Sequence, residues 1–214
     1  MRVDLWSDLV CPFCWIGITN FRRGLEELGD AAPQVELHWR AFMLDPDADA
    51  TPVPLAEAYA NKFGGEQQAR DMFQRVEQAG RAAGLPIDFS RGQVRVSTLP
   101  AHRLMWLARE RGADVDAVAE ALFSAHFAQG RSLGEAATLV DAGAAGGLDQ
   151  AAVEALLAGS EGTQPVQADM GQARQLGITA VPFFVLDGRL AVRGAQPPEV
   201  FAGALRQAGG LAST

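Results

Sequence analysis

The only two cysteines of the chain lie in one tetrapeptide, Cys11-Pro12-Phe13-Cys14. Alternating apolar residues over 2–6 predict a β-strand before it, and a helical pattern begins at Pro12, a residue that suits the first helical position because no N–H is needed there. The spacing places the two sulfurs about one helical turn apart, close enough for a small disulfide. Unpaired N–H groups and the helix dipole favour a thiolate at the first sulfur. The arrangement is typical of dithiol–disulfide exchange.

A CxxC pair also occurs as half of a zinc site. Structural zinc needs four ligands, and the chain offers only His38, His102 and His126 besides the two cysteines. None of the three histidines is paired with another at the H-x3–5-H spacing, so we expect no metal site.

The residues after the tetrapeptide predict a β-α-β opening. Apolar side chains recur at steps of three and four over residues 14–28, so we expect a helix that ends at Gly29-Asp30. Alternation over residues 35–41 predicts a second strand.

The middle of the chain is helical in pattern and contains no convincing strand. A linker rich in Pro and Asp, residues 45–54, is followed by stretches of helical spacing that are separated by glycines. These stretches are 69–83, 101–108 and 115–123. We predict a helical insertion domain over residues 46–160.

The C-terminal part predicts a helix over 166–176, a strand over 179–186, a turn at Asp187-Gly188, a return strand over 189–192 and a last helix that opens at Pro197-Pro198. Joined to the opening, it predicts an α/β thioredoxin-like fold: residues 1–45 plus 161–214 form one domain, which the helical insertion divides in two.

Composition excludes several classes of partner. The net charge is −8, and Lys and Arg are scattered, so we expect no nucleic-acid partner and no anionic membrane surface. The longest apolar stretch, residues 178–186, is too short to span a bilayer. The first eight residues carry charges and no apolar core of a secretory signal, so we expect a cytoplasmic protein. In that reducing compartment a disulfide is more often catalytic than structural.

Four segments together resemble the DsbA-like thioredoxin-fold family, and in particular its FrnE-like cytoplasmic branch, whose fold is split by a helical insertion as in kappa-like proteins. The matching segments are Ser7–Gly17, Ala101–Leu104, Leu122–Arg131 and Val181–Phe184 with the following Gly194–Gln196. They span most of the chain, so the resemblance extends beyond the cysteine motif.

The resemblance implies roles for individual residues. Cys11 is expected to be the nucleophile and Cys14 the resolving thiol, which exchange with a substrate through a mixed disulfide. Pro182 resembles the cis-proline of the family, and the backbone of Val181 is expected to pair with an incoming peptide. An ordinary trans proline at the start of an edge strand is the alternative reading of Pro182 from the residues alone.

Residues around the cysteines are expected to tune the site. Strongly oxidising periplasmic members carry histidine where this chain has Phe13, so less stabilisation of the thiolate and a milder oxidant are expected. Pro12, Phe13 and Trp15 are predicted to contact substrate, although Trp15 equally suits core packing. If its carboxylate lies near Cys11, the negative charge of Asp8 would disfavour a thiolate there, but a loop-ordering role in binding nearby backbone N–H groups is favoured.

Two histidines are predicted to have structural roles. His126 shares a helical face with Val115, Ala119 and Leu122, which predicts a core histidine whose hydrogen bonds are satisfied. His102 is predicted to lie on a helix surface or in packing.

The function predicted is a thiol–disulfide oxidoreductase or isomerase acting on protein or peptide disulfides. It needs no cofactor beyond the Cys11–Cys14 pair, with glutathione as a conceivable co-substrate and an unidentified redox partner. Two alternatives stay open: a kappa-like glutathione-dependent transferase or isomerase, whose relatives carry Ser where this chain has Cys11, and a chaperone-like peptide-binding module in which the cysteines matter little.

Overall fold

The computed structural model describes residues 1–210 of the chain. A four-stranded sheet with the order β2-β1-β5-β6 forms its centre. The strands are β1 (Arg2–Ser7), β2 (Glu36–Ala41), β5 (Phe183–Leu186) and β6 (Leu190–Arg193). β1 runs parallel to β2 and antiparallel to β5, and β5 runs antiparallel to β6. The predicted α/β thioredoxin-like architecture is confirmed.

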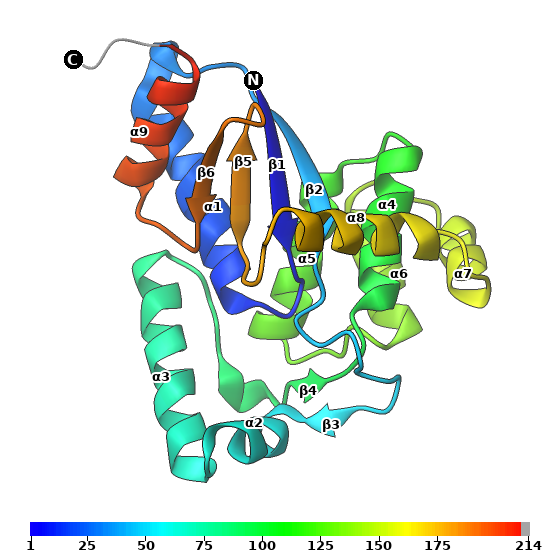
Figure 1. Cartoon of the computed structure of the whole chain (residues 1–214). Coiled ribbons are helices and arrows are strands. Elements are labelled where there is room, and N and C mark those ends of the chain that lie inside the picture. The colour runs from blue at the N-terminus through cyan, green and yellow to red at the C-terminus, as the bar shows by residue number, and fades with distance from the viewer. Residues whose placement is uncertain (211–214) are drawn as a thin grey trace.

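Helices pack on the sheet, and the two cysteines lie at the start of α1. α1 (Pro12–Leu28) packs along α9 (Pro198–Ala208), and both lie on the opposite side of the sheet from α8 (Thr163–Gln175), which crosses β1 and β2 in Figure 1. α1 buries its apolar face, and Phe21 stacks on Phe184 at 5.4 Å between ring centroids. The helix ends at Leu28 and is followed by a short 3₁₀ turn (Gly29–Ala31), close to the predicted end.

The middle of the chain is helical, as predicted, except for one short pair of strands. Its helices are α2 (Leu55–Phe63), α3 (Glu66–Ala82), α4 (Leu99–Glu110), α5 (Val115–Phe123), α6 (Ala136–Ala145) and α7 (Gln150–Ala158). The expectation that this region has no strand is wrong, because β3 (Val53–Pro54) pairs with β4 (Val94–Arg95). Each strand has only two residues, too few for an alternating pattern to reveal.

Short irregular helices interrupt this region. Phe89–Arg91 forms a 3₁₀ turn, and Ser124–Ala128 forms a π-helical segment directly after α5. π-helical segments are rare and are often found at functional sites. His126 lies in the π-helical segment.

One contiguous apolar cluster extends from the sheet into the helical middle of the chain. The indole of Trp15 on α1 stacks on Phe123 of α5 at 6.0 Å and on Phe127 at 6.1 Å. The packing is thus shared between the two predicted parts, and the division into two domains stays a prediction. No helix within residues 1–210 is long and apolar enough to cross a membrane.

The hairpin between β5 and β6 turns at Asp187-Gly188, as its sequence predicts. Asp187 and Gly188 both have positive φ, 47° and 67°, and the Arg189 N–H donates to the Leu186 carbonyl at 3.0 Å. Asp and Gly accept this backbone conformation more readily than other residues, which is why the pair signals a turn.

Candidate active site

The two cysteines lie at the N-terminal end of α1, just after the end of β1. Cys11 is the residue before the helix, with an extended backbone, and Pro12 takes the first helical position. Both cysteines are free thiols, and they approach each other to 3.5 Å. The Cys14 N–H donates to the Cys11 carbonyl at 3.0 Å, which closes the first turn around the pair.

The two thiols differ in their surroundings. Cys11 is 5 % exposed and Cys14 is 0 % exposed. Burial raises the pKa of the Cys14 thiol well above its ordinary value, and neighbouring Cys11 acts in the same direction, while Ser7 and the Asp8 backbone oppose both. Cys14 therefore forms a thiolate less readily than an ordinary cysteine does.

Cys11 faces the loop that leads into β5. Its Sγ donates to the Val181 carbonyl at 3.7 Å, and the Val181–Pro182 peptide bond is cis. Gly17 on α1 lies against the Pro182 ring, where a Cβ added at Gly17 would come within 2.7 Å of Pro182 Cγ. Cys11 and Val181 are far apart in the sequence. They lie close together because β1, which precedes Cys11, pairs with β5, which follows Val181.

Of the aromatic residues predicted to contact substrate, Phe13 and Trp15 have opposite environments. Phe13 is 45 % exposed beside the cysteines, where it is free to contact a substrate. Trp15 is 1 % exposed, and its indole N–H donates to the Glu120 carboxylate at 3.0 Å. The prediction that Trp15 contacts substrate is wrong: position 15 faces α5 because it lies on the buried side of α1.

Asp8 is buried and binds more than the predicted local backbone. Its Oδ2 accepts the Leu44 N–H at 2.8 Å, and its Oδ1 lies 3.3 Å from His102 Nε2. The carboxylate accepts a backbone N–H, as expected, but the N–H belongs to Leu44, beyond the end of β2, and not to the loop that contains Asp8. His102 is buried against Asp8, so of the two predicted positions, on a helix surface or in packing, the structure shows the second.

His126 is buried, as predicted, but neither of its ring nitrogens has a hydrogen-bond partner within residues 1–210. Its ring meets Phe127 edge-on at 4.7 Å. Burial lowers the pKa of His126 to about 4, which keeps the imidazole neutral at physiological pH. The expectation of satisfied hydrogen bonds is wrong.

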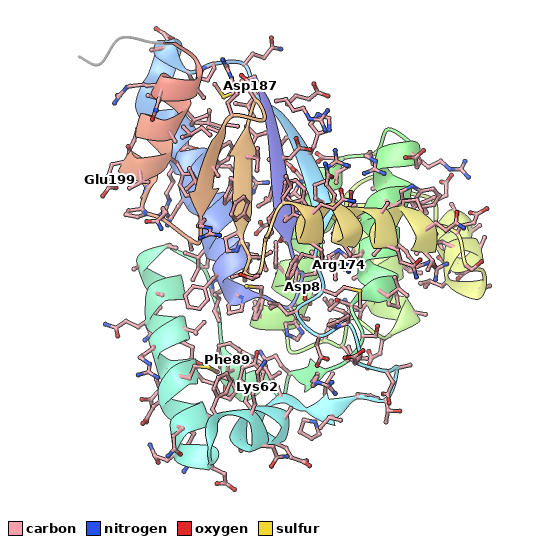
Figure 2. The ribbon with its side chains drawn as sticks, in the orientation of Figure 1. Asp8, Lys62, Phe89, Arg174, Asp187 and Glu199 are labelled. Atoms are coloured by element: carbon pink, nitrogen blue, oxygen red, sulfur yellow. The ribbon has the colours of Figure 1, made fainter. Side chains whose placement is uncertain are left out.

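A cleft of about 550 Å³ opens beside the loop that carries Cys11. Its walls include Asp8 and Val10 of that loop and Tyr59 and Lys62 of α2. Figure 2 shows Asp8 near the end of β1, toward the segment that carries Lys62. Burial raises the pKa of Tyr59, with smaller contributions from Cys11, Asp8 and Asp45, so the phenol stays protonated near the thiols. Sequence spacing gave no signal for this cleft, because it joins three distant segments.

No group of three or more His, Cys, Asp or Glu side chains within residues 1–210 has a geometry that could hold a metal ion. The arrangement offers the chemistry of two adjacent thiols. One of them, Cys11, lies beside an open cleft and contacts Val181, directly before β5.

Comparison with known proteins agrees with this geometry. A probable DsbA oxidoreductase from Streptomyces coelicolor is 37 % identical, with a TM-score of 0.91, and the match covers 100 % of this chain and 92 % of that one. The cytosolic disulfide reductase DsbM from Pseudomonas aeruginosa, also solved with GSH, is 18 % identical, with a TM-score of 0.70 over 99 % of this chain and 100 % of that one. The uncharacterized protein YwbO from Bacillus subtilis is 24 % identical over 94 % of both chains.

The family comparison covers nearly the whole sequence. The model of the DSBA-like thioredoxin domain matches residues 2–206, from the first strand to the last helix. The chain belongs to the family of DSBA-like thioredoxin domain proteins, whose members are disulfide oxidoreductases.

Proposed function

We propose that the chain exchanges electrons with protein or peptide disulfides through Cys11 and Cys14. The observation that carries the proposal is the approach of two free thiols to 3.5 Å at the N-terminal end of α1. A pair at this separation is close to the geometry of a disulfide and needs only a small side-chain movement to form one.

In the reducing direction the Cys11 thiolate attacks one sulfur of the substrate disulfide, forms a mixed disulfide and releases the first substrate thiolate. Cys14 then loses its proton and attacks Cys11 Sγ. The Cys11–Cys14 disulfide forms, and the second substrate sulfur leaves as a thiolate. Two electrons pass from the protein to the substrate, and the reverse sequence oxidises a substrate dithiol.

The different environments of the cysteines support this division of roles. The helix N-terminus stabilises a thiolate at Cys11, which also has the greater access to solvent. Cys14 is buried and its pKa is raised, so it suits an intramolecular attack that follows substrate binding.

Binding of the substrate backbone is assigned to the Val181–Pro182 segment. Val181 lies against Cys11, directly before β5, so an extended peptide paired with its backbone would bring a disulfide to the Cys11 sulfur. The cleft beside Val10 and Tyr59 would accept the side chains around that disulfide, with Phe13 as an exposed apolar contact. Pro12, half-buried in the first turn between Cys11 and Phe13, is assigned a contact with the same substrate.

Phe13 lacks the N–H and positive charge of a histidine, so the reduced pair gains less stabilisation and the protein is a mild oxidant or a reductant. A mild reduction potential suits a cytoplasmic location and glutathione as the reductant. The cytosolic Pseudomonas neighbour, which was solved with GSH, supports both assignments. The reaction requires no cofactor other than the dithiol.

The test compares Cys11→Ser with the wild-type protein in insulin reduction and in reactivation of a scrambled disulfide protein. Both activities are expected to be abolished, because serine cannot form the mixed disulfide. Full activity in Cys11→Ser would overturn the proposal. Turnover of a chloronitrobenzene with glutathione that survives the substitution would instead favour the kappa-like transferase, and unchanged suppression of aggregation by the double cysteine variant would favour the chaperone-like module.

A further inference from the structure

The cleft beside the active-site loop has a mixed lining, in which valine and leucine side chains surround four charged ones. Three of the four charged side chains already have partners in the protein. Arg95 Nε donates to Asp45. Asp8 is buried, and its two carboxylate oxygens are held by the Leu44 N–H and by His102. These three groups therefore have little left to offer a ligand.

The fourth charged side chain is Lys62, near the C-terminal end of α2. It is exposed, and within residues 1–210 no carboxylate lies within ion-pair distance of its ammonium. In Figure 2 it lies on the side of α2 that faces Asp8 and the active-site loop. A cation at a cleft with apolar walls attracts an anion more strongly than one on an open surface, because the effective dielectric constant is lower there.

Tyr59 places a hydrogen-bond donor one turn before Lys62. Residues three apart share a face of a helix, and both side chains line the cleft. The Tyr59 ring is held by its neighbours, with ring centroids 5.3 Å from Phe63 and 5.5 Å from Phe73. Burial raises the pKa of Tyr59, so the phenol stays protonated and can donate. One face of α2 thus presents a cation and a donor to the same space.

This space adjoins the redox pair. Val10 lines the cleft and directly precedes Cys11, whose sulfur contacts the Val181 carbonyl. A substrate whose sulfur reaches Cys11 therefore has its neighbouring residues beside the cleft. The volume of about 550 Å³ is that of a typical ligand site and has room for a few residues of a peptide.

The overall charge of the protein makes any preference for acidic substrates a local one. The net charge is −8, so long-range attraction does not favour an acidic peptide. A carboxylate gains from binding only where it reaches an unpaired cation, and Lys62 is the side chain of this kind in the lining of the cleft.

We propose that Lys62 and Tyr59 select peptide disulfides that carry a carboxylate side chain close to the reacting cysteine, an inference that rests on the function proposed above. The Lys62 ammonium pairs with the carboxylate, and the Tyr59 hydroxyl donates to it, while the substrate sulfur meets Cys11. Both residues determine specificity, and neither takes part in electron transfer. The substrate class is an acidic segment of a protein or peptide.

The experiment uses short peptides with blocked ends, joined in pairs through one cysteine each and labelled with a dye that is quenched in the disulfide. One set carries a single Glu at successive positions on either side of the cysteine, and a matching set carries Gln. Dithiothreitol regenerates the reduced protein, and the fluorescence increase above the rate without protein gives kcat/KM. At the best position we expect Glu to exceed Gln by about fivefold to tenfold, between the effect of an exposed ion pair and that of a hydrogen bond to a charged group.

Substitutions on α2 assign the preference to its residues. Lys62→Met should abolish the preference for Glu, and Lys62→Glu should reverse it in favour of a peptide with Lys at the same position. Tyr59→Phe keeps the ring and should reduce the preference by about twofold or more. Arg75→Met on α3 is the matched control and should keep it, because Arg75 is also exposed and lies outside the cleft.

A second measurement needs no substitution. Lys62 is the only lysine of the chain, so an acetylating reagent modifies this side chain and the terminal amino group. A Glu peptide with serine in place of its cysteine binds without reacting and is expected to slow acetylation of Lys62, whereas the Gln peptide should not. The terminal amino group donates to the Gln34 carbonyl outside the cleft and serves as the internal reference in mass spectrometry.

Equal rates for the Glu and Gln peptides at every position, or equal protection of Lys62 by both, would overturn the selection while leaving the proposed function intact. Failure of the wild-type protein to reduce any of the peptides would overturn the proposed function itself. Glutathione disulfide also carries carboxylates near its sulfurs and is measured in parallel. A dependence on Lys62 for glutathione disulfide, and for none of the peptides, would overturn the assignment to acidic peptide segments.

Discussion

The two sides of the dithiol are built from different chemistry. The side of Cys11 is open, with Phe13 exposed, the Val181 carbonyl in contact and a large cleft of mixed polar and apolar lining nearby. The side of Cys14 is closed and polar, with Ser7 and Asp8 buried beside it. The contrast indicates that the first sulfur meets the substrate, whereas the second acts only within the protein.

The largest expected effect tests this contrast directly. Cys14→Ser should trap substrate on Cys11 as a stable mixed disulfide, because no second thiol remains to release it. Cys11→Ser should trap none, since Cys14 is fully buried. Mass spectrometry of each variant after incubation with a peptide disulfide measures the adduct. Equal trapping by both variants would contradict the assignment.

The next largest effect is expected from the close contact between Gly17 on α1 and Pro182. Gly17→Ala should destabilise the protein by about 1–3 kcal/mol, the usual cost of overpacking, because the new Cβ meets Pro182 Cγ at 2.7 Å. It should also lower activity by displacing Val181. Urea unfolding and insulin reduction measure the two effects.

Gly203→Ala on α9 provides the matched control for Gly17→Ala. An added Cβ there meets nothing within 4 Å, and alanine is the better helix former, so stability should stay the same or rise. Equal destabilisation by the two substitutions would show that the contact with Pro182 is unimportant.

His126, in the π-helical segment, is a further buried titratable group, and its protonation is expected to affect stability. Its pKa of about 4 in the folded protein lies below the ordinary value of 6.5, so the unfolded chain binds more protons between these values. The contribution of neutral His126 to stability is fully present above its ordinary pKa of 6.5 and is lost as the pH falls towards 4. We expect a loss of about 2 kcal/mol between roughly pH 7 and pH 5 from this group.

His126→Leu should remove that part of the pH dependence and cost little stability at neutral pH, because neither ring nitrogen loses a hydrogen bond within the described residues. Urea unfolding at several pH values, compared with the wild-type protein, measures it. The same pH dependence in His126→Leu would place its origin elsewhere.

The smallest expected effect concerns the open side. Phe13→His should make the pair more oxidising by roughly 30 mV or more, a tenfold change in the equilibrium constant, because imidazole stabilises the thiolate. Phe13→Leu is the control, since it keeps an apolar side chain and should leave the potential unchanged. A shift of the same size in both variants would contradict the idea that the residue at position 13 sets the potential through an imidazole.

Local patterns predicted the frame of this fold well. Period-two and helical spacing, together with Pro12 and the Asp187-Gly188 turn, were sufficient for β1, α1, β2 and the C-terminal hairpin. The β3–β4 pair escaped because two-residue strands carry no period. The spacing also predicted that Cys11 and Cys14 would lie together.

The remainder of the site depends on contacts between distant segments. His102 meets Asp8 across 94 residues, and the cleft joins the Cys11 loop to α2 and β4. Nothing in the local pattern of α4 distinguishes a buried partner of Asp8 from a surface histidine. Trp15 was ambiguous for a related reason, because its burial depends on where α5 packs.

The most direct test of the central claim is redox equilibration of the Cys11–Cys14 pair in buffers of graded glutathione potential, with the thiol state read by alkylation and mass spectrometry. We expect one reversible two-electron transition to an intramolecular disulfide, at a potential less oxidising than that of Phe13→His. Failure of the pair to form that disulfide at any potential would contradict it.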